Sequence, residues 1–144
     1  MGLFWVSICF SQVKIKAPSA KSDQISDLQL QRSSPAHAEL LLKKTELQSE
    51  LESLLLGYTE EYPKVVEIRY SLTILQKESN RILAVKAAES SKLTLALGKL
   101  MVRKSELETD LWQLLRTYKE GHPDVKRAKR KVEIYEAAIK EILG

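Results

Sequence analysis

The sequence has only one cysteine, Cys9, among its 144 residues. A lone cysteine excludes an intrachain disulfide and a cysteine-built zinc site. Aromatic residues make up 6%, and only five glycines and four prolines interrupt the chain, whereas charged residues reach 29%. This composition is unusual for a compact enzyme with a broad apolar core. It favours long helices with narrow apolar stripes.

A strong excess of one charge sign is also lacking. Lysine and arginine number 23 against 19 acidic residues, which gives a formal net charge of +4. A dedicated nucleic-acid binder gathers a much more lopsided charge on one face. The balance therefore makes nucleic acid an unlikely main partner.

Motifs that carry chemistry are missing as well. The sequence has no phosphate-binding glycine loop, no paired-histidine zinc helix and no calcium loop. Its two histidines, His37 in a linker and His122 at a turn, are far apart and have no matched nucleophile or ligand spacing. The sequence therefore predicts a non-enzymatic protein without metal or cofactor.

The N-terminus has a short apolar run at residues 3–10. The run is too short to span a bilayer but resembles the hydrophobic part of a secretory signal, with Cys9 and Ser11 as the small residues before a cut. No basic residue precedes Lys14, so the sequence start is a candidate truncation. We expect residues 1–11 to direct export to the periplasm, leaving no membrane span in the mature chain. The alternative is a cytoplasmic protein whose apolar start is buried or covered by a partner.

Residues 12–37 are rich in Ser, Gln, Lys and Asp and show no sustained apolar period. Such a segment is expected to form a flexible linker. At its end, Ser34 and Pro35 are typical of a helix start, with serine as the N-cap and proline at the first helical position. The ordered part of the chain is expected to begin there and to occupy residues 38–144.

An internal duplication organises this ordered part. Residues 40–83 align without gaps to residues 100–143 at an offset of 60, and fourteen of the 44 pairs are identical. In each copy, apolar residues recur at alternating spacings of four and three before a proline, and a second such seam follows the proline. The two copies, at about residues 38–88 and 97–144, are each predicted to hold two helices.

A short turn ending at Pro63 or Pro123 joins the two helices of each copy. Proline disfavours helical geometry in the residue before it and suits a first helical turn, so the chain is expected to reverse at both places. Reversal sets Leu47 opposite Leu75, and apolar residues meet at the other levels too. The predicted fold class is all-α, with two tandem antiparallel coiled-coil hairpins.

The segment between the two copies leaves the arrangement of the hairpins open. No proline interrupts the pattern there, so the hairpins can share one long central helix. Ser90, Ser91 and Gly98 weaken that helix, and the apolar spacing slips near Leu93 and Leu97 as at a stutter. A continuous rod and a folded four-helix bundle are both compatible with this pattern.

Two lysines, Lys44 and Lys104, lie on the apolar seams, opposite Ser79 and Ile139. A long lysine stem covers apolar surface cheaply, so we expect both ammonium groups to reach solvent. The alternative is a polar seam position that selects register or partner.

Hairpins of this kind bury only a stripe, so self-association or partner helices are expected to cover the remaining apolar residues, such as Leu42, Leu56 and Leu95. Trp112 replaces Glu52 of the first copy. It is the best candidate for a contact outside its own hairpin, and the alternative is an aromatic ring that shields the edge of the seam.

One run of charge stands out, with five basic residues in six: Lys126, Arg127, Lys129, Arg130 and Lys131. Such a run suits phosphate, an acidic polysaccharide or an anionic lipid surface. It lacks the interleaved aromatic residues that stack on bases. We therefore expect a solvated helix flank around a buried Ala128, with an anionic polymer as the alternative partner.

The segment from Leu107 to Ile139 resembles the periplasmic coiled coil of bacterial polysaccharide chain-length determinant and exopolysaccharide export proteins, the polysaccharide co-polymerases. The matching positions in the second copy are Tyr118, His122, Pro123, Asp124 and Val125, and those in the first are Tyr58, Thr59, Pro63 and Val65. The second copy departs from the motif at Lys119, and the first departs at Tyr62 and Lys64.

The flanking membrane helices and the nucleotide-binding kinase domain of those proteins are not in this sequence. The resemblance therefore implies a stand-alone periplasmic relative or a fragment. Its expected role is that of an interaction or scaffold protein whose hairpins dock on helices of an envelope polysaccharide assembly or export complex. The alternative is an intracellular coiled-coil adaptor that binds polyanions or nucleic acid through residues 126–131.

Overall fold

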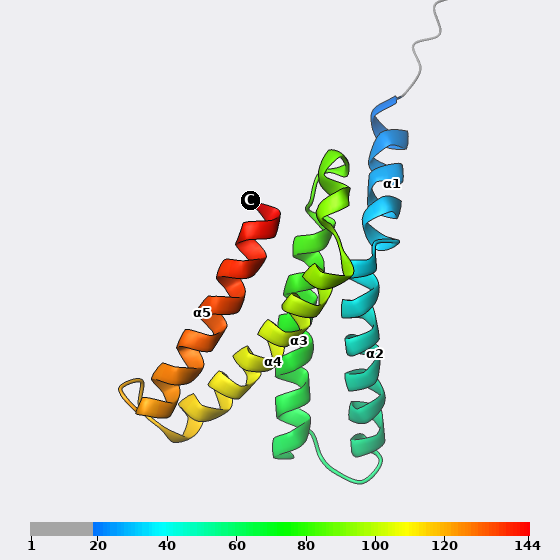
Figure 1. The fold of residues 1–144 in the computed structure, drawn as a ribbon. Helices are drawn as coiled ribbons and strands as arrows, with labels where there is room; N and C mark the ends of the chain where they lie inside the picture. The colour runs from blue at the N-terminus through cyan, green and yellow to red at the C-terminus, as the bar shows by residue number, and fades with distance from the viewer. Residues whose placement is uncertain (1–18) are drawn as a thin grey trace, which may run out of the picture.

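The structure, a computed structural model, describes residues 19–144, with side chains from residue 26 onward. All regular elements in this part of the chain are helices, and it has no strands (Figure 1). Its elements are α1 (Ser19–Arg32), α2 (Pro35–Leu55), α3 (Pro63–Leu83), the short 3₁₀ helix η1 (Ala87–Lys92), α4 (Leu95–Thr117) and α5 (Pro123–Leu143). The predicted signal segment, residues 1–11, lies outside the described residues. Among the described helices, none is both long and apolar enough to cross a membrane.

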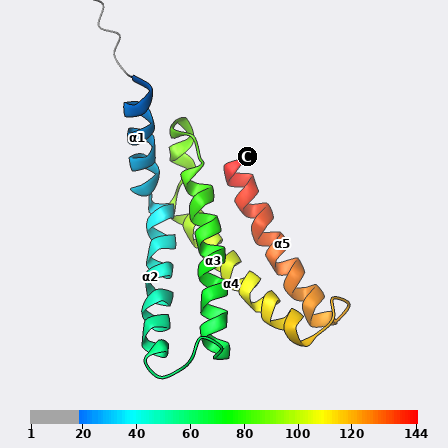
Figure 2. The same ribbon diagram turned by 180° about the vertical axis from the view of Figure 1, so that it is seen from behind.

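The two predicted hairpins are present. Helices α2 and α3 form the first, α4 and α5 form the second, and the chain reverses at Pro63 and Pro123, each the first residue of its helix. Both turns lie at one end of the molecule, while α1, η1 and the C-terminus lie at the other (Figures 1 and 2). The all-α fold class and the tandem hairpins are confirmed.

The seam of the first hairpin is buried as its apolar spacing predicts. Leu51, Val65 and Ile68 form a buried cluster, and Leu54 and Leu72 pack against it. Full burial of one such side chain stabilises the fold by about 1.5–3 kcal/mol.

A second and larger core lies where the hairpins cross. Helix α4 packs against α2 and α3 as well as against its own partner α5. The buried members of this core come from both hairpins and the linker between them: Ala36, Leu40, Leu75, Ile82, Leu93, Leu97, Met101 and Ile139. The two hairpins therefore share one apolar interior.

The long central helix does not form. Helix α3 ends at Leu83, and α4 begins only at Leu95, after η1. Thr94 caps α4, because its hydroxyl accepts from the backbone N–H of Leu97 at 3.3 Å. Leu93 is buried in the shared core. Folding back buries apolar residues that a straight rod would leave exposed, so the folded arrangement replaces the rod.

The prediction of a flexible linker at residues 12–37 is wrong for its described part. Residues 19–32 form α1, and α2 already begins at Pro35, so His37 lies in a helix. The side-chain amide of Gln31 donates to the backbone carbonyl of Val85, which ties α1 to the segment after α3. This tertiary contact stabilises a helix that lacks a strong apolar period of its own.

The predicted start of α2 is confirmed in detail. Ser34 is the N-cap, its hydroxyl accepts from the backbone N–H of His37 at 3.2 Å, and Pro35 is the first helical residue. The backbone N–H of Ala36 donates to the carbonyl of Leu93 at 3.3 Å. The cap therefore also fixes α2 against the linker that precedes α4.

Candidate functional site

The two hairpin turns carry the same ring stack. Tyr58 stacks on Tyr62 with ring centroids 4.1 Å apart, and Tyr118 stacks on His122 at the same distance. The stacked pairs are related by the offset of 60 residues. In both, the second ring directly precedes the helix-starting proline. Stacking of this kind contributes about 0.5–1.5 kcal/mol beyond area burial.

An ion pair across each turn is duplicated as well. In the first hairpin Arg69 Nε donates to Glu60 Oε2 at 2.7 Å, and in the second Lys129 Nζ lies 3.4 Å from Glu120 Oε2. Both pairs are exposed or nearly so, so each stabilises its turn only weakly. The ion pair at equivalent positions shows that the two turns share the same local structure.

The remaining turn residues of the predicted site serve the start of the second helix of each hairpin. Val65 and Val125 are fully buried beneath their turns. His122 Nδ1 accepts from the backbone N–H of Asp124 at 3.2 Å, and the Asp124 carboxylate pairs with Arg127. A carboxylate in the first turn complements the helix dipole. The motif that carries the family resemblance thus shapes the turn.

A buried charge cluster, which we call the Lys104 cluster, lies where the hairpins cross. Lys104 Nζ donates to Glu78 Oε1 at 2.6 Å and lies 3.2 Å from Glu108 Oε1 and from Glu136 Oε2. Arg81 Nη1 lies 3.1 Å from Glu136 Oε2 and 3.7 Å from Glu78 Oε2. Glu78 and Arg81 come from α3, Lys104 and Glu108 from α4, and Glu136 from α5. The cluster therefore joins both hairpins.

The cluster favours the charged forms of Lys104 and Glu136. Burial lowers the pKa of Lys104, but the hydrogen bond and the charge of Glu78 outweigh it, so the pKa lies above its ordinary value. Burial raises the pKa of Glu136, but hydrogen bonds from Arg81 and Lys104 bring it below the ordinary value. A lysine with a raised pKa suits an ion pair, whereas a lysine base or nucleophile needs a lowered pKa.

The expectation that both seam lysines reach solvent holds for Lys44 alone. Its ammonium donates to Gln76 Oε1 at 2.6 Å in an exposed contact. Lys104, by contrast, is only 5% exposed. Its burial accompanies the crossing of the hairpins, which places Glu78 of α3 against the Lys104 ammonium.

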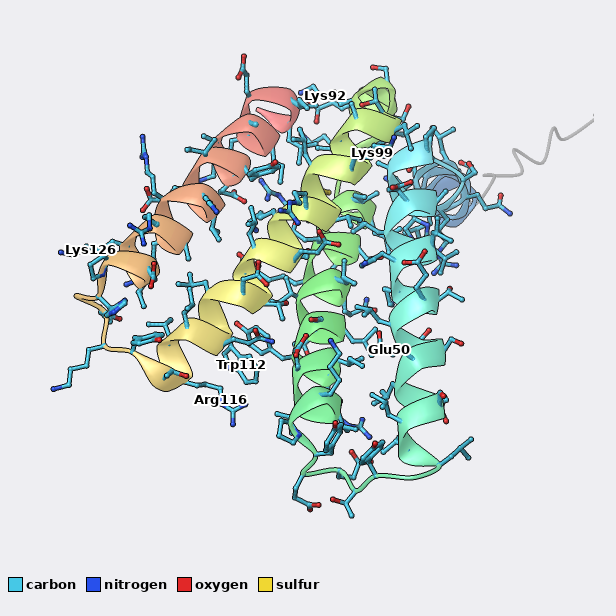
Figure 3. The ribbon with its side chains drawn as sticks, turned by 60° about the horizontal axis from the view of Figure 1, so that its bottom comes forward. Glu50, Lys92, Lys99, Trp112, Arg116 and Lys126 are labelled. Atoms are coloured by element: carbon cyan, nitrogen blue, oxygen red, sulfur yellow. The ribbon has the colours of Figure 1, made fainter. Side chains whose placement is uncertain are left out.

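Trp112 projects from α4 toward the first hairpin (Figure 3). Its ring stacks on Tyr70 of α3 with centroids 4.5 Å apart, and the Arg116 guanidinium lies 4.9 Å from the ring centroid. Trp112 therefore contacts a hairpin other than its own, within the same chain.

The basic run lies at the start of α5, with Lys126 at its outer edge (Figure 3). Three of its five cations pair with nearby carboxylates: Arg127 with Asp124, Lys129 with Glu120, and Arg130 with Glu133. Ala128 is buried between them, as predicted. Pairing with these carboxylates reduces the charge that the run offers to an anionic polymer.

Several large apolar side chains lie on the surface. Leu56 is 91% exposed beside the first turn, and Leu42 and Leu95 are also exposed, as predicted. Leu41 and Ile134 belong to the same group. Exposed apolar residues on helix faces are typical of contacts with other helices.

Sequence reasoning missed the partners of Lys104. Glu136 is the counterpart of Gln76, which Lys44 contacts in the first copy, so the duplication relates the two contacts once one of them is known. Glu78 has no such relation, since its counterpart is Ala138 and its contact with Lys104 arises only from the crossing of the hairpins. Among the described residues, no group of three or more His, Cys, Asp or Glu side chains is placed to hold a metal ion.

The chain was compared with protein-family models, curated proteins and solved structures, and none of them matches it.

Proposed function

We propose that this protein is a non-enzymatic interaction module of the bacterial periplasm that docks on helices of an envelope polysaccharide assembly or export complex. Its hairpin turns present the contact residues, and the shared core holds the two hairpins in fixed orientation. The protein makes no covalent bonds in this role.

The observation that supports this proposal is the repeated turn. Both turns combine a stacked ring pair, an ion pair and a buried valine after the proline, and they lie at one end of the molecule. These turns include the positions by which the sequence resembles the periplasmic coiled coil of chain-length determinants. The signal-like residues 1–11 point to the same compartment.

Export is tested with alkaline phosphatase fused to the C-terminus of the full chain and produced in a bacterium. The enzyme needs disulfides that form outside the cytoplasm, so the fusion is active only after export. We expect activity, and a mature chain that begins at Gln12 in mass spectrometry. The matched control is Ile8→Asp, which interrupts the apolar run and should abolish activity. An inactive wild-type fusion that retains Met1 contradicts export.

The link to polysaccharide is tested separately. In the bacterium that makes this protein, removal of the gene should change the length distribution of an envelope polysaccharide on gels, and the wild-type gene should restore it. A gene with Tyr58→Ala and Tyr118→Ala should restore it only in part, because both stacked turns are weakened. An unchanged length distribution after removal contradicts this part of the proposal.

A further inference from the structure

Within the chain, α4 docks on the first hairpin through one helical face. Gly98 approaches the backbone of Ala36, so that an added Cβ would lie only 2.9 Å from it. Met101 and Ser105 are buried on this face, and the Thr109 hydroxyl lies 2.9 Å from that of Ser71. We call this the docking face of α4.

Helix α2 carries the same face 60 residues earlier. Met101, Ser105 and Thr109 correspond to Leu41, Thr45 and Ser49, and every pair from residue 40 to residue 51 is identical or chemically similar. The local bonding is repeated too. The Thr45 hydroxyl donates to the Leu41 carbonyl at 2.9 Å, as the Ser105 hydroxyl donates to the Met101 carbonyl at 2.8 Å. A hydroxyl bonded in this way can be buried without leaving an unmet polar group.

The environment of the two faces is the difference between them. Met101 is fully buried, whereas Leu41 is 53% exposed and its neighbour Leu42 is 56% exposed. Thr45 and Ser49 are exposed as well. Helix α2 therefore presents to solvent a face that α4 uses for packing.

The surface that receives α4 is also duplicated and uncovered in its second copy. On α3 this surface includes Tyr70 and Ser71, which contact α4. Ile74 lies one turn further along the same side of α3. The counterparts on α5 are Arg130, Lys131 and Ile134. Ile74 is 7% exposed, but Ile134 is 54% exposed. On α2 the surface includes Ala36, which is fully buried, and the counterpart Ala96 on α4 is exposed. We call this second copy the receptor face.

Charges at the altered positions are complementary between the two uncovered faces. Where Trp112 stacks on Tyr70 inside the chain, a copy docked in the same way sets Glu52 opposite Arg130. Where Glu106 lies 3.1 Å from Lys43, the docked copy sets Glu46 opposite Arg103. Aromatic stacking is replaced by an ion pair, and the existing ion pair keeps its sign. Such complementarity favours this register over others.

On α4 the receptor face and the docking face point in opposite directions. On α4, Ala96 and Arg103 belong to the receptor face, and Met101 and Ser105 belong to the docking face. At about 100° per residue these two sets lie on opposite sides of the helix. Because α4 turns its docking face toward the first hairpin, its receptor face points away from the first hairpin, to which α2 belongs. The receptor face therefore stays available when the exposed α2 face of the same copy is occupied.

We propose that copies of this protein associate head to tail, with the α2 face of one copy docked on the α4–α5 receptor face of the next. The contact repeats the packing of α4 on the first hairpin. Ala38 stands where α4 has Gly98, and its methyl group sets the docked helix slightly further out than α4 is from α2. A heterologous contact of this kind grows into rings or open chains. The inference does not rest on the compartment or on the polysaccharide complex of the proposed function.

The first test is sedimentation velocity of the full chain over a wide concentration range. We expect species larger than a dimer to appear as concentration rises. Leu41→Glu alters only the exposed α2 face, and Ile134→Glu alters only the receptor face. Each should stop growth beyond the monomer. Lys126→Glu, an exposed change elsewhere on α5, is the matched control and should leave growth unchanged.

Mixing the two variants separates a head-to-tail contact from a symmetric dimer. The Leu41→Glu chain keeps its receptor face, and the Ile134→Glu chain keeps its α2 face. An equimolar mixture should therefore form a capped 1:1 dimer that does not grow. In a symmetric dimer each variant would damage the shared contact, and the mixture would not recover it. Circular dichroism of each variant establishes that it is folded.

A charge exchange tests the register. Glu52→Arg and Arg130→Glu should each weaken association by at least about tenfold, and the double variant should recover most of the loss. A chain that stays monomeric at every concentration overturns the proposal. Oligomers that persist in both Leu41→Glu and Ile134→Glu overturn it as well, as does a mixture that forms no dimer. None of these results bears on export or on polysaccharide length.

Discussion

Lys44 and Lys104 occupy the same position in the two hairpins and differ in what surrounds them. Each reaches the same place on the opposite helix of its own hairpin, Gln76 for Lys44 and Glu136 for Lys104. Only Lys104 is also covered by a helix of the other hairpin, which adds Glu78. The contact within the hairpin thus follows from the repeat. Burial follows from the way the two hairpins cross.

This comparison shows how a duplicated unit acquires different roles for its copies. The copy whose helix is covered needs a compensated charge, because an unpaired buried ammonium is costly. The copy whose helix stays exposed tolerates a neutral amide as partner. The same residue is therefore a surface contact in one hairpin and part of the interface between hairpins in the other.

The largest expected effect comes from removing the two ammonium groups in turn. Lys104→Met should lower the free energy of unfolding by about 3–5 kcal/mol, because Glu78 loses its closest cation while it stays buried. Lys44→Met, the matched control, should cost less than about 1 kcal/mol. Urea denaturation followed by circular dichroism measures both. Equal losses would show that the crossing of the hairpins does not set the difference.

A smaller effect is expected where the hairpins approach most closely. Gly98→Ala places a methyl group 2.9 Å from the backbone of Ala36 and should cost about 1–3 kcal/mol, although alanine is the better helix former. The counterpart change, Ala38→Gly, lies on an exposed face and should cost about 0.5–1 kcal/mol through helix propensity. Thermal unfolding compares the two. A stabilising Gly98→Ala would mean that α2 and α4 can move apart freely.

The smallest expected effect is a pH dependence of stability that arises from Glu136 of the second hairpin. Arg81 and Lys104 hold the pKa of Glu136 below its ordinary value, against the effect of burial. Its stabilising contribution is therefore present above the ordinary glutamate pKa of about 4.3 and is lost as pH falls through the lower folded-state pKa. Urea midpoints between pH 7 and pH 3 should decline less steeply for Glu136→Gln than for the wild type.

The counterpart change tests whether this pH dependence is specific. Gln76→Glu places a carboxylate beside the exposed Lys44 and should leave the acid slope nearly unchanged, because solvent screens that pair. A steep decline of the urea midpoint in acid for Gln76→Glu would contradict the distinction between the hairpins.

In the alkaline range the raised pKa of Lys104 acts in the opposite sense. Its contribution is complete below the ordinary lysine pKa of about 10.4 and is lost only above it.

The features that the sequence predicted are those with local causes. Pro63 and Pro123 restrict the backbone directly, and the leucine spacing around them defines the two helices that meet. Ser34 caps α2 through a hydroxyl only three residues from the N–H that it binds. Such effects act over a few residues, so they can be read from one sequence.

The features that the sequence did not predict depend on contacts between distant segments. Helix α1 is held in part by Gln31 on Val85, and the break before α4 is favoured by the burial of Leu93 in a core built from both hairpins. The burial of Lys104 needs Glu78 from 26 residues earlier in the chain. None of these partners follows from a repeat or a periodicity.

The position of both turns at one end of the molecule has a consequence for avidity. A partner that recognises the stack of Tyr58 and Tyr62 meets a second, similar stack of Tyr118 and His122 on the same rigid body. Because the spacing is fixed, the second binding event is intramolecular and occurs at a high effective concentration. Two hairpin turns that each bind weakly can then retain a bivalent partner far longer than one turn alone.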